Sequence, residues 1–380
     1  MKVHGCKPII AAGLVTLIVA FSLLRSSEAA DVSGCPFLPV SQYKAVNFID
    51  KRLMAKETNQ WLTFEAPSIY DRLNEIKSTG LNAIRLTYFW EGYTANPVAF
   101  VNGLQEISTT ADQLGLCVVY DFHQGFAGSH FDYWGGGFPS FLTGSYSGNR
   151  DGELSFWNDY YDNNISYKGT KIWDLQFNLI RDVVIKNVDS HPSTAGYEIL
   201  NEPAVNDCNQ FAKIGNMQTY IGSKIREVTS KPIFFDRAEN ESCQYSNDQS
   251  YDKQVMPRGI SNLVFAPHIY TKGSPTILSY LLSLSHNWQP GMRVFIGEWG
   301  QISDEDSSSS SKFFGYKDNN TGIVTQDVVD NYLQAFKNNN VGWAYYSWDP
   351  VYTYAIKDQS YKNTIYKAYL QNGISRIYGN

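Results

Sequence analysis

Two glutamates in this sequence could act together in acid–base or nucleophilic chemistry, because each directly follows an apolar run. In EILNEPAVND (residues 198–207) the apolar run stops at Asn201, Glu202 and Pro203, and Glu298 follows the run RVFIG in the same way. Pro203 cannot donate a backbone hydrogen bond, so it ends a strand and leaves Glu202 at the strand's end. Two carboxyl groups whose surroundings separate their pKa values can serve as an acid and a nucleophile.

Eight short apolar runs must position these residues, and segments with helical periodicity separate them. The runs are YKAVNFI, LNAIRLTYF, LCVVYDFH, TAGYEILNE, KPIFFD, NLVFAPHIY, RVFIGEW and VGWAYYSW. Helices are predicted at 68–80, 98–115 and 171–188, and the first two end on glycine. Strands that alternate with helices predict parallel βαβ units, and eight such units predict an α/β fold, a single-domain (β/α)8 TIM barrel. A doubly wound open sheet is the competing fold, but no glycine-rich fingerprint follows the first run.

Polar residues stand at the C-terminal ends of most runs, and in a barrel those ends open onto one face. They are Arg85, Asp121, His123, Asn201, Glu202, His268, Tyr270, Glu298 and Trp348. The fourth and seventh runs face each other across an eight-stranded barrel, so Glu202 and Glu298 are expected to approach each other. Cleavage of a glycosidic bond needs one carboxylic acid that protonates the leaving oxygen and a second carboxylate opposite it. The two glutamates fit that requirement.

These residues resemble the pattern of the family 5 glycoside hydrolases, the cellulase-type members of a large clan of retaining TIM-barrel glycosidases. The matching stretches are IRLTYFW, YDFHQ, NEP, HIY, GEWG and YYSW, and the resemblance runs from about Val46 to Trp348. It implies that Glu202 is the acid/base, with a raised pKa, and that Glu298 is the nucleophile.

The same resemblance assigns the other polar residues to substrate binding and orientation. Arg85 and Tyr270 would orient Glu298 and favour its charged form, and Asn201 would bond the sugar 2-hydroxyl. His123 and His268 would line the same subsite. Trp348 would form a platform under the distorted sugar.

A long connection after the third run, residues 124–170, is too long for a plain βα loop and is rich in aromatic residues and glycines. Long loops after barrel strands usually serve function. Its aromatic residues could stack on sugars or merely fill the loop's own core; they are Trp134, Trp157, Tyr160 and Tyr161. The loop is similar to that of the endoglycoceramidase branch of the family. This similarity implies that Phe138 and Phe141 would contact a lipid aglycone.

The substrate expected from the family resemblance is a linear β-1,4-linked glucan, cleaved within the chain. A glycolipid or a mannan is the alternative. A non-catalytic carbohydrate-binding barrel is the alternative of another class, but it would have lost one of the two glutamates. His and Glu are good metal ligands, yet barrel metallohydrolases usually need a histidine pair on the first strand, and KAVNFID has none. Neither a metal nor another cofactor is predicted.

The net charge of the chain limits its possible binding partners, and the N-terminal segment indicates its location. The chain has 37 acidic and 31 basic residues and a net charge of -6, so it offers no basic stripe for nucleic acid and favours a neutral polysaccharide. Lys2 and Lys7 precede the apolar run IIAAGLVTLIVAFSLL, which predicts a signal peptide at 1–29 and a catalytic domain at 30–380. An uncleaved membrane anchor is the alternative. The mature protein is expected to be a secreted monomer without stable membrane association.

Four cysteines remain after the leader is removed, in a compartment that permits disulfides. Cys208 and Cys243 follow the fourth and fifth runs, which are neighbours in a barrel, so these two cysteines are predicted to pair. Cys117 lies inside the third run and is expected to be reduced and buried. Cys35 has no evident partner.

Overall fold

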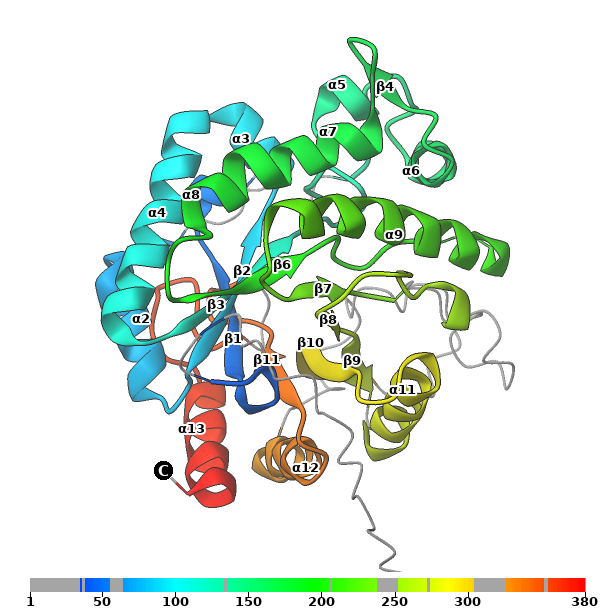
Figure 1. The fold of residues 1–380 in the computed structure, drawn as a ribbon. Coiled ribbons are helices and arrows are strands. Elements are labelled where there is room, and N and C mark those ends of the chain that lie inside the picture. Colours follow the sequence, from blue (N-terminus) through cyan, green and yellow to red (C-terminus); the bar gives the residue numbers. More distant parts are fainter. Residues whose placement is uncertain are drawn as a thin grey trace, which may run out of the picture. The chain divides into compact units, whose positions relative to one another are not determined.

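Parallel strands close into a barrel that helices surround (Figure 1). The strands are β1 (Lys44–Ile49), β2 (Ala83–Tyr88), β3 (Cys117–Phe122), β6 (Thr194–Glu198), β7 (Ile233–Phe235), β8 (Leu263–Phe265), β9 (His268–Thr271), β10 (Arg293–Ser303) and β11 (Gly342–Tyr345). β8 and β9 both pair with β10 and together fill one barrel position. β11 pairs with β1 on one side and β10 on the other, which closes the barrel. The predicted TIM barrel is confirmed, and every predicted run contains a strand.

This computed structural model describes residues 35, 38–54, 64–132, 135–205, 207–237, 252–271, 274–303, 325–351 and 355–379. Residues 32–380 form one compact unit. The predicted signal peptide, residues 1–29, lies outside the described residues. Within the described ranges, no helix is both long and apolar enough to cross a membrane.

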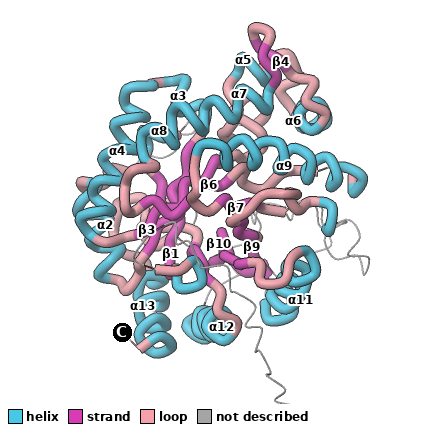
Figure 2. Tube along the Cα trace, in the orientation of Figure 1, coloured by secondary structure: helices cyan, strands magenta, loops and turns pink. Residues whose placement is uncertain are grey.

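Helices form the outer layer around the strands (Figure 2). They are α2 (Ile69–Ser78), α3 (Trp90–Ala95), α4 (Pro97–Leu114), α7 (Ile172–Leu179), α8 (Lys186–Val188), α9 (Phe211–Val228), α11 (Ser274–Trp288), α12 (Gln326–Asn338) and α13 (Ile365–Tyr378). A π-helical stretch, η3 (Ile180–Ile185), joins α7 to α8. Short 3-10 turns are η1 (Val40–Gln42), η2 (Lys51–Leu53), η4 (Cys208–Gln210) and η5 (Asp252–Gln254).

The ends of α4 show how the sequence sets a helix's limits. The Asn96 side chain accepts a hydrogen bond from the Ala99 N–H, and Pro97 occupies the first helical turn, where its missing N–H costs nothing. Gly115 ends the helix with a φ of 64°, a left-handed conformation that glycine adopts without strain.

Successive side chains of β3 point to opposite sides, so this strand contributes to two separate cores. Val118, Tyr120 and Phe122 pack in the large core between the barrel and its helices. Cys117 and Val119 point the other way, into a second core inside the barrel. Because successive side chains alternate, Asp121 follows them on the interior side. The barrel interior is therefore apolar at its N-terminal end and polar where the strands end.

The long loop after β3 builds a small substructure with α5 (Ser140–Thr143), α6 (Arg150–Tyr161) and the hairpin of β4 (Ser166–Tyr167) and β5 (Thr170–Lys171), which gathers near α7 in Figure 1. Trp157, Tyr160 and Tyr161 are buried in it. The Phe138 ring, also fully buried, lies 5.1 Å from the Tyr160 ring, centroid to centroid. These rings fill the loop's own core and offer no exposed face to a sugar; Trp134 lies outside the described residues.

The disulfide arrangement corrects two predictions. Cys35 and Cys117 form a disulfide with a Cα–Cα distance of 5.7 Å, so the expectation of a reduced Cys117 and an unpartnered Cys35 is wrong. Both lie in the core inside the barrel, together with Val40 and Tyr43. The segment before β1 thus returns under the N-terminal end of the barrel, a placement that strand order alone does not predict.

The predicted pairing of Cys208 with Cys243 stays a prediction. Cys208 is disulfide-bonded, but Cys243 lies outside the described residues.

Removing the Cys35–Cys117 bond should destabilise the barrel. The bond spans 82 residues, and the chain-entropy relation for a loop of that length gives about 4.5 kcal/mol. We expect the Cys35→Ala/Cys117→Ala double variant to lower the free energy of unfolding by about that amount in guanidinium titrations. Mild reductant on the native wild type should have little effect, because both cysteines are fully buried. An unchanged unfolding midpoint in the double variant would contradict this.

Candidate active site

Arg85 is the centre of a buried polar network at the C-terminal end of the barrel. Its guanidinium, on β2, is fully buried and pairs bidentately with Glu198 through Nε (2.7 Å) and Nη2 (2.9 Å). Nη1 donates to Glu298 Oε1 (2.7 Å) and Asn47 Oδ1 (2.9 Å). Nη2 also donates to Asn201 Oδ1 (2.8 Å). One cation thus fixes four side chains, which come from β1, β6, the segment after β6 and β10.

Glu298 on β10 receives hydrogen bonds on both carboxylate oxygens. Arg85 donates to Oε1, and the Tyr270 hydroxyl, from β9, donates to Oε2. The side chain is only 5% exposed. The predicted orientation of Glu298 by Arg85 and Tyr270 matches these contacts.

Glu202 stands just beyond β6 on a backbone turned into the left-handed region, with a φ of 40°. Its N–H donates to Asp236 Oδ2 (3.1 Å), and its carbonyl accepts from Gln124 Nε2 (2.7 Å). A non-glycine residue in this conformation costs about 1–2 kcal/mol, and such residues cluster at functional sites. The two backbone hydrogen bonds hold the turn. The Glu202 side chain is 28% exposed, whereas the Glu298 side chain is 5% exposed.

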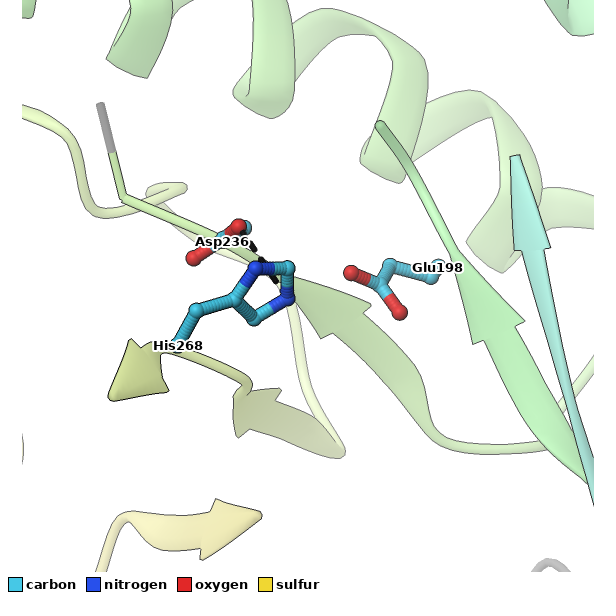
Figure 3. A group of neighbouring side chains, drawn as sticks. All are labelled: Glu198, Asp236 and His268. Carbon is cyan, nitrogen blue, oxygen red and sulfur yellow. Dashed lines mark ion pairs between the residues drawn. The ribbon is translucent and has the colours of Figure 1, made fainter. Parts of the chain in front are cut away.

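His268 at the start of β9 connects the two glutamates. Its Nδ1 lies 2.7 Å from Glu202 Oε1 and 3.6 Å from Glu298 Oε2. Its Nε2 points the other way, 3.6 Å from Asp236 Oδ2. Figure 3 shows the Asp236 and Glu198 carboxylates directed toward the imidazole ring. Burial lowers the pKa of His268 to about 4, although Glu298 favours the charged form, so the ring is neutral near pH 7.

Burial also shifts the other titratable groups. It raises the pKa of Glu202; His123 and Arg85 oppose that shift, whereas Asp121 and Glu198 add to it. It raises the pKa of Asp121 to about 7 against the attraction of Arg85. It lowers the pKa of His123 to about 4. The site therefore holds Glu202 in the protonated form to higher pH than an exposed glutamate.

The remaining predicted residues reach the network by different contacts. His123 Nδ1 lies 2.6 Å from Asp121 Oδ2, and Asp121 lies 3.1 Å from Arg85. Asn201 donates from Nδ2 to the Gln124 carbonyl (2.9 Å). Trp348 joins through its backbone, whose N–H donates to the Asn47 carbonyl (2.9 Å).

The Trp348 ring is fully buried, and its indole N–H has no hydrogen-bond partner among the described residues. Lys357 Nζ lies 5.3 Å from the centre of the ring. The role of Trp348 as a platform under the sugar stays a prediction.

Sequence reasoning missed three residues that hold the site: Asn47, Glu198 and Asp236. Asp236 ends the run KPIFFD and could have been found by the same strand-end rule that found the others. Asn47 and Glu198 lie inside apolar runs, and a polar residue within a buried strand is the available signal. Without the barrel, however, nothing in the sequence says that both side chains meet Arg85.

Two groups of side chains bring three potential metal-binding atoms within 4.8 Å of one another: Glu198, Asp236 and His268, and Glu202, His268 and Glu298. Both Glu198 oxygens already accept from Arg85. Asp236 Oδ1 accepts from the Arg237 N–H and Oδ2 from the Glu202 N–H. The guanidinium of Arg85 thus supplies the positive charge in this cluster.

The separation of the two glutamates distinguishes the stereochemical classes of glycosidase. One carboxylate oxygen of Glu202 and one of Glu298 lie within 4.8 Å of each other. Retaining enzymes hold their carboxyl groups about 5–5.5 Å apart, whereas inverting enzymes need about 6.5–9.5 Å for a water molecule. The barrel and this pair of glutamates define a glycoside hydrolase of the retaining type.

Comparison with protein families specifies this class further. Residues 42–351 match the family described as Cellulase (glycosyl hydrolase family 5), and the chain belongs to that family. The resemblance noted in the sequence is confirmed. A comparison with curated proteins found no match.

Solved structures with the same fold include an endogalactoceramidase and an endo-glycoceramidase. An endogalactoceramidase is 16% identical with a TM-score of 0.61, over 80% of this chain and 70% of that chain. Endo-glycoceramidase II from Rhodococcus sp., in a ganglioside GM3 complex, is 12% identical with a TM-score of 0.63, over 86% of this chain and 78% of that chain. At these identities the likeness shows the barrel fold.

Replacing Arg85 should disrupt both stability and activity. A lysine at this position has one ammonium group and cannot reproduce the fork that joins Glu198, Glu298 and Asn201. We expect Arg85→Lys to lower the free energy of unfolding by about 3–5 kcal/mol, since it breaks a buried charge network, and to abolish turnover. Urea titration and initial rates measure the two effects.

Arg52→Lys is the matched control. Arg52 also binds two carboxylates, Asp50 (2.8 Å) and Glu106 (2.6 Å), but its side chain is 32% exposed. Its substitution should cost about 1 kcal/mol or less and leave turnover intact. Equal losses in both variants would contradict the central role of Arg85.

Proposed function

We propose that this protein is a secreted, endo-acting β-glycoside hydrolase that works by double displacement, with Glu202 as acid/base and Glu298 as nucleophile. The observation that carries the proposal is the convergence of the two carboxyl groups within 4.8 Å at the end of the barrel. Their surroundings differ in the sense that the reaction needs. Glu298 receives a guanidinium and a hydroxyl hydrogen bond, whereas burial raises the pKa of Glu202.

In the first step, the Glu298 carboxylate attacks the anomeric carbon while Glu202 donates its proton to the departing oxygen. This forms a glycosyl ester on Glu298 and releases the aglycone or the rest of the glycan. In the second step, Glu202 removes a proton from water, which attacks the same carbon and frees Glu298. Two inversions leave the β configuration unchanged. Asn201, whose Oδ1 accepts a hydrogen bond from Arg85, would bond the sugar 2-hydroxyl.

The proposed substrate is a neutral β-1,4-linked glucan. Membership of the cellulase family and the acidic charge of the chain support this proposal. The loop aromatics do not add support, because Trp157, Tyr160 and Tyr161 are buried in the loop core.

A glycolipid is the second candidate, and one observation favours it. Phe141, on the same loop, is 40% exposed and packs with a centroid distance of 4.4 Å against Tyr167. An exposed aromatic pair could contact a lipid aglycone. Phe138 does not, because it is fully buried.

Secretion is part of the proposal and rests on the N-terminal leader and on the disulfide. The Cys35–Cys117 bond is of a kind that persists in oxidising compartments. Asn164 in the loop also lies in a glycosylation sequon, Asn-Ile-Ser.

Substitution of each glutamate tests the assigned roles. Glu298→Gln keeps the side-chain volume but removes the nucleophile, so turnover should fall by at least about 10⁴-fold. Glu202→Ala should lose about 10²–10⁴-fold on natural glycans but much less on aryl glycosides with activated phenols, which leave without an acid. Added azide should partly rescue Glu202→Ala and yield a β-glycosyl azide. Wild-type rates in either variant would overturn the assignment.

A substrate panel separates the two candidates. The glucan hydrolase should lower the viscosity of carboxymethyl-cellulose or mixed-linkage β-glucan faster than it releases glucose, because internal cuts shorten chains without freeing monomers. The Glu298→Gln variant is the control for contaminating activity. If the polymers stay intact while oligosaccharide is freed from a glycosphingolipid, the glycolipid candidate is correct.

A further inference from the structure

Asp236 lies behind the two glutamates, and the reaction scheme above gives it no role. It follows β7, and its side chain is fully buried. Oδ2 accepts the N–H of Glu202 (3.1 Å) and lies 3.6 Å from Nε2 of His268. Asp236 therefore contacts both the backbone of the proposed acid/base and the imidazole that bonds its carboxyl group.

The position of the His268 proton decides what the imidazole does to Glu202. The ring is neutral near pH 7, so one nitrogen carries a proton and the other offers a lone pair. A proton on Nδ1 would be donated to Glu202 Oε1, 2.7 Å away, and would favour the ionised carboxylate. A proton on Nε2 would leave Nδ1 as an acceptor, which favours a protonated Glu202.

The charges around the ring favour the proton on Nε2. This nitrogen is buried, has no hydrogen-bond partner among the described residues, and faces the carboxylates of Asp236 and Glu198 (Figure 3). A lone pair directed at two carboxylates is unfavourable, whereas an N–H there is attracted to both. On the Nδ1 side, Glu298 lies 3.6 Å away, but Arg85 and Tyr270 already donate to its oxygens.

We propose that Asp236 is the positioning residue of the acid/base: it keeps the His268 proton on Nε2, so that Nδ1 accepts a hydrogen bond from the Glu202 carboxyl O–H, and it fixes the turned backbone of Glu202. This inference rests on the proposed function, which makes Glu202 the acid. The arrangement serves both steps of the reaction. The Oε1–H···Nδ1 hydrogen bond stabilises protonated Glu202 before the first step. In that step the proton leaves this hydrogen bond and moves to the leaving oxygen, and the Nδ1 lone pair next to the new carboxylate then makes Glu202 a stronger base toward water.

Other charged and titratable groups face Glu202 and His268 and must be kept constant in any test. They are Arg85 on β2, Asp121 and His123 at β3, Glu198 on β6, Tyr270 on β9 and Glu298 on β10. The tests of the pH profile therefore leave all of these groups unchanged.

The pH profile of Asp236→Asn is the main test. The alkaline limb of kcat/KM reports loss of the acid's proton in the free enzyme. Removing the Asp236 charge lets the His268 proton move to Nδ1, which favours the ionised Glu202, so the limb should move about one unit toward lower pH. Aryl β-cellobiosides with a poor phenol leaving group are the probe, replaced by aryl β-lactosides if the substrate panel selects the glycolipid. An unmoved limb overturns the inference.

Asp112→Asn is the matched control. Asp112 accepts the Ser193 N–H (2.7 Å) and lies 2.6 Å from His191 Nδ1, so it is also an aspartate that joins a backbone N–H to a histidine, but near the start of β6. It should leave the limb in place. A shift of the limb of similar size in Asp112→Asn would mean that the effect of Asp236→Asn does not depend on its place beside Glu202, and would overturn the inference.

Leaving groups separate positioning from a structural role. With an activated phenol the first step needs no acid, so kcat/KM of Asp236→Asn should stay within about threefold of wild type. With the poor leaving group it should fall about tenfold or more. Equal losses on both substrates would mean that Asp236 only supports the fold.

Two further measurements do not depend on one variant. Nitrogen-15 NMR of histidine-labelled wild type, with the His268 signals assigned by their loss in His268→Gln, should show the proton on Nε2; a proton on Nδ1 overturns the inference. In the His268→Gln background, Asp236→Asn should no longer move the limb. If Glu202→Ala keeps wild-type activity, the proposed function itself fails. If Glu202→Ala loses activity but the limb ignores Asp236, the inference alone is wrong.

Discussion

One buried guanidinium sets the chemistry of this barrel. Arg85 faces Glu198, Glu298 and Asp121, with Glu202 nearby, so a single positive charge is surrounded by several carboxyl groups. A buried charge without a partner is strongly disfavoured, and one cation cannot neutralise every carboxylate. Burial raises the pKa of Glu198, Asp121 and Glu202 against the attraction of Arg85. The guanidinium donates a hydrogen bond directly to Glu298, the proposed nucleophile.

Backbone geometry supplies the second constraint. Glu202 lies just beyond β6 and has a left-handed backbone conformation. Hydrogen bonds from Gln124 to its carbonyl and from its N–H to Asp236 stabilise that conformation. The acceptor for its N–H comes from the next strand position in the barrel, and the imidazole that contacts its carboxyl group comes from the position after that. The proposed acid/base is thus held by neighbours that converge only when the barrel closes. The long loop after β3 also contacts the barrel, since the Phe138 ring lies 5.6 Å from the Phe122 ring, centroid to centroid.

The chemistry and the substrate have different structural origins. The network around Arg85 belongs to the strands and their ends. The loop of residues 124–170 adds rings that are mostly buried, among them Phe138, Trp157 and Tyr160. On this loop Phe141 is 40% exposed and packs against Tyr167. The identity of the bond that is cleaved is therefore better determined by the structure than the identity of the glycan.

The sequence by itself determined the fold class, the strands and most of the site, because these depend on local patterns. Apolar runs mark the strands, glycines end the helices, and polar residues at strand ends must share one face of a parallel barrel. It did not determine contacts between residues far apart in the chain. The Cys35–Cys117 bond depends on how the first segment returns under the barrel, and the roles of Glu198 and Asp236 depend on which side chains meet inside it. Such contacts arise only when the strands close, since closure brings distant residues within bonding distance and removes the water that would otherwise solvate them.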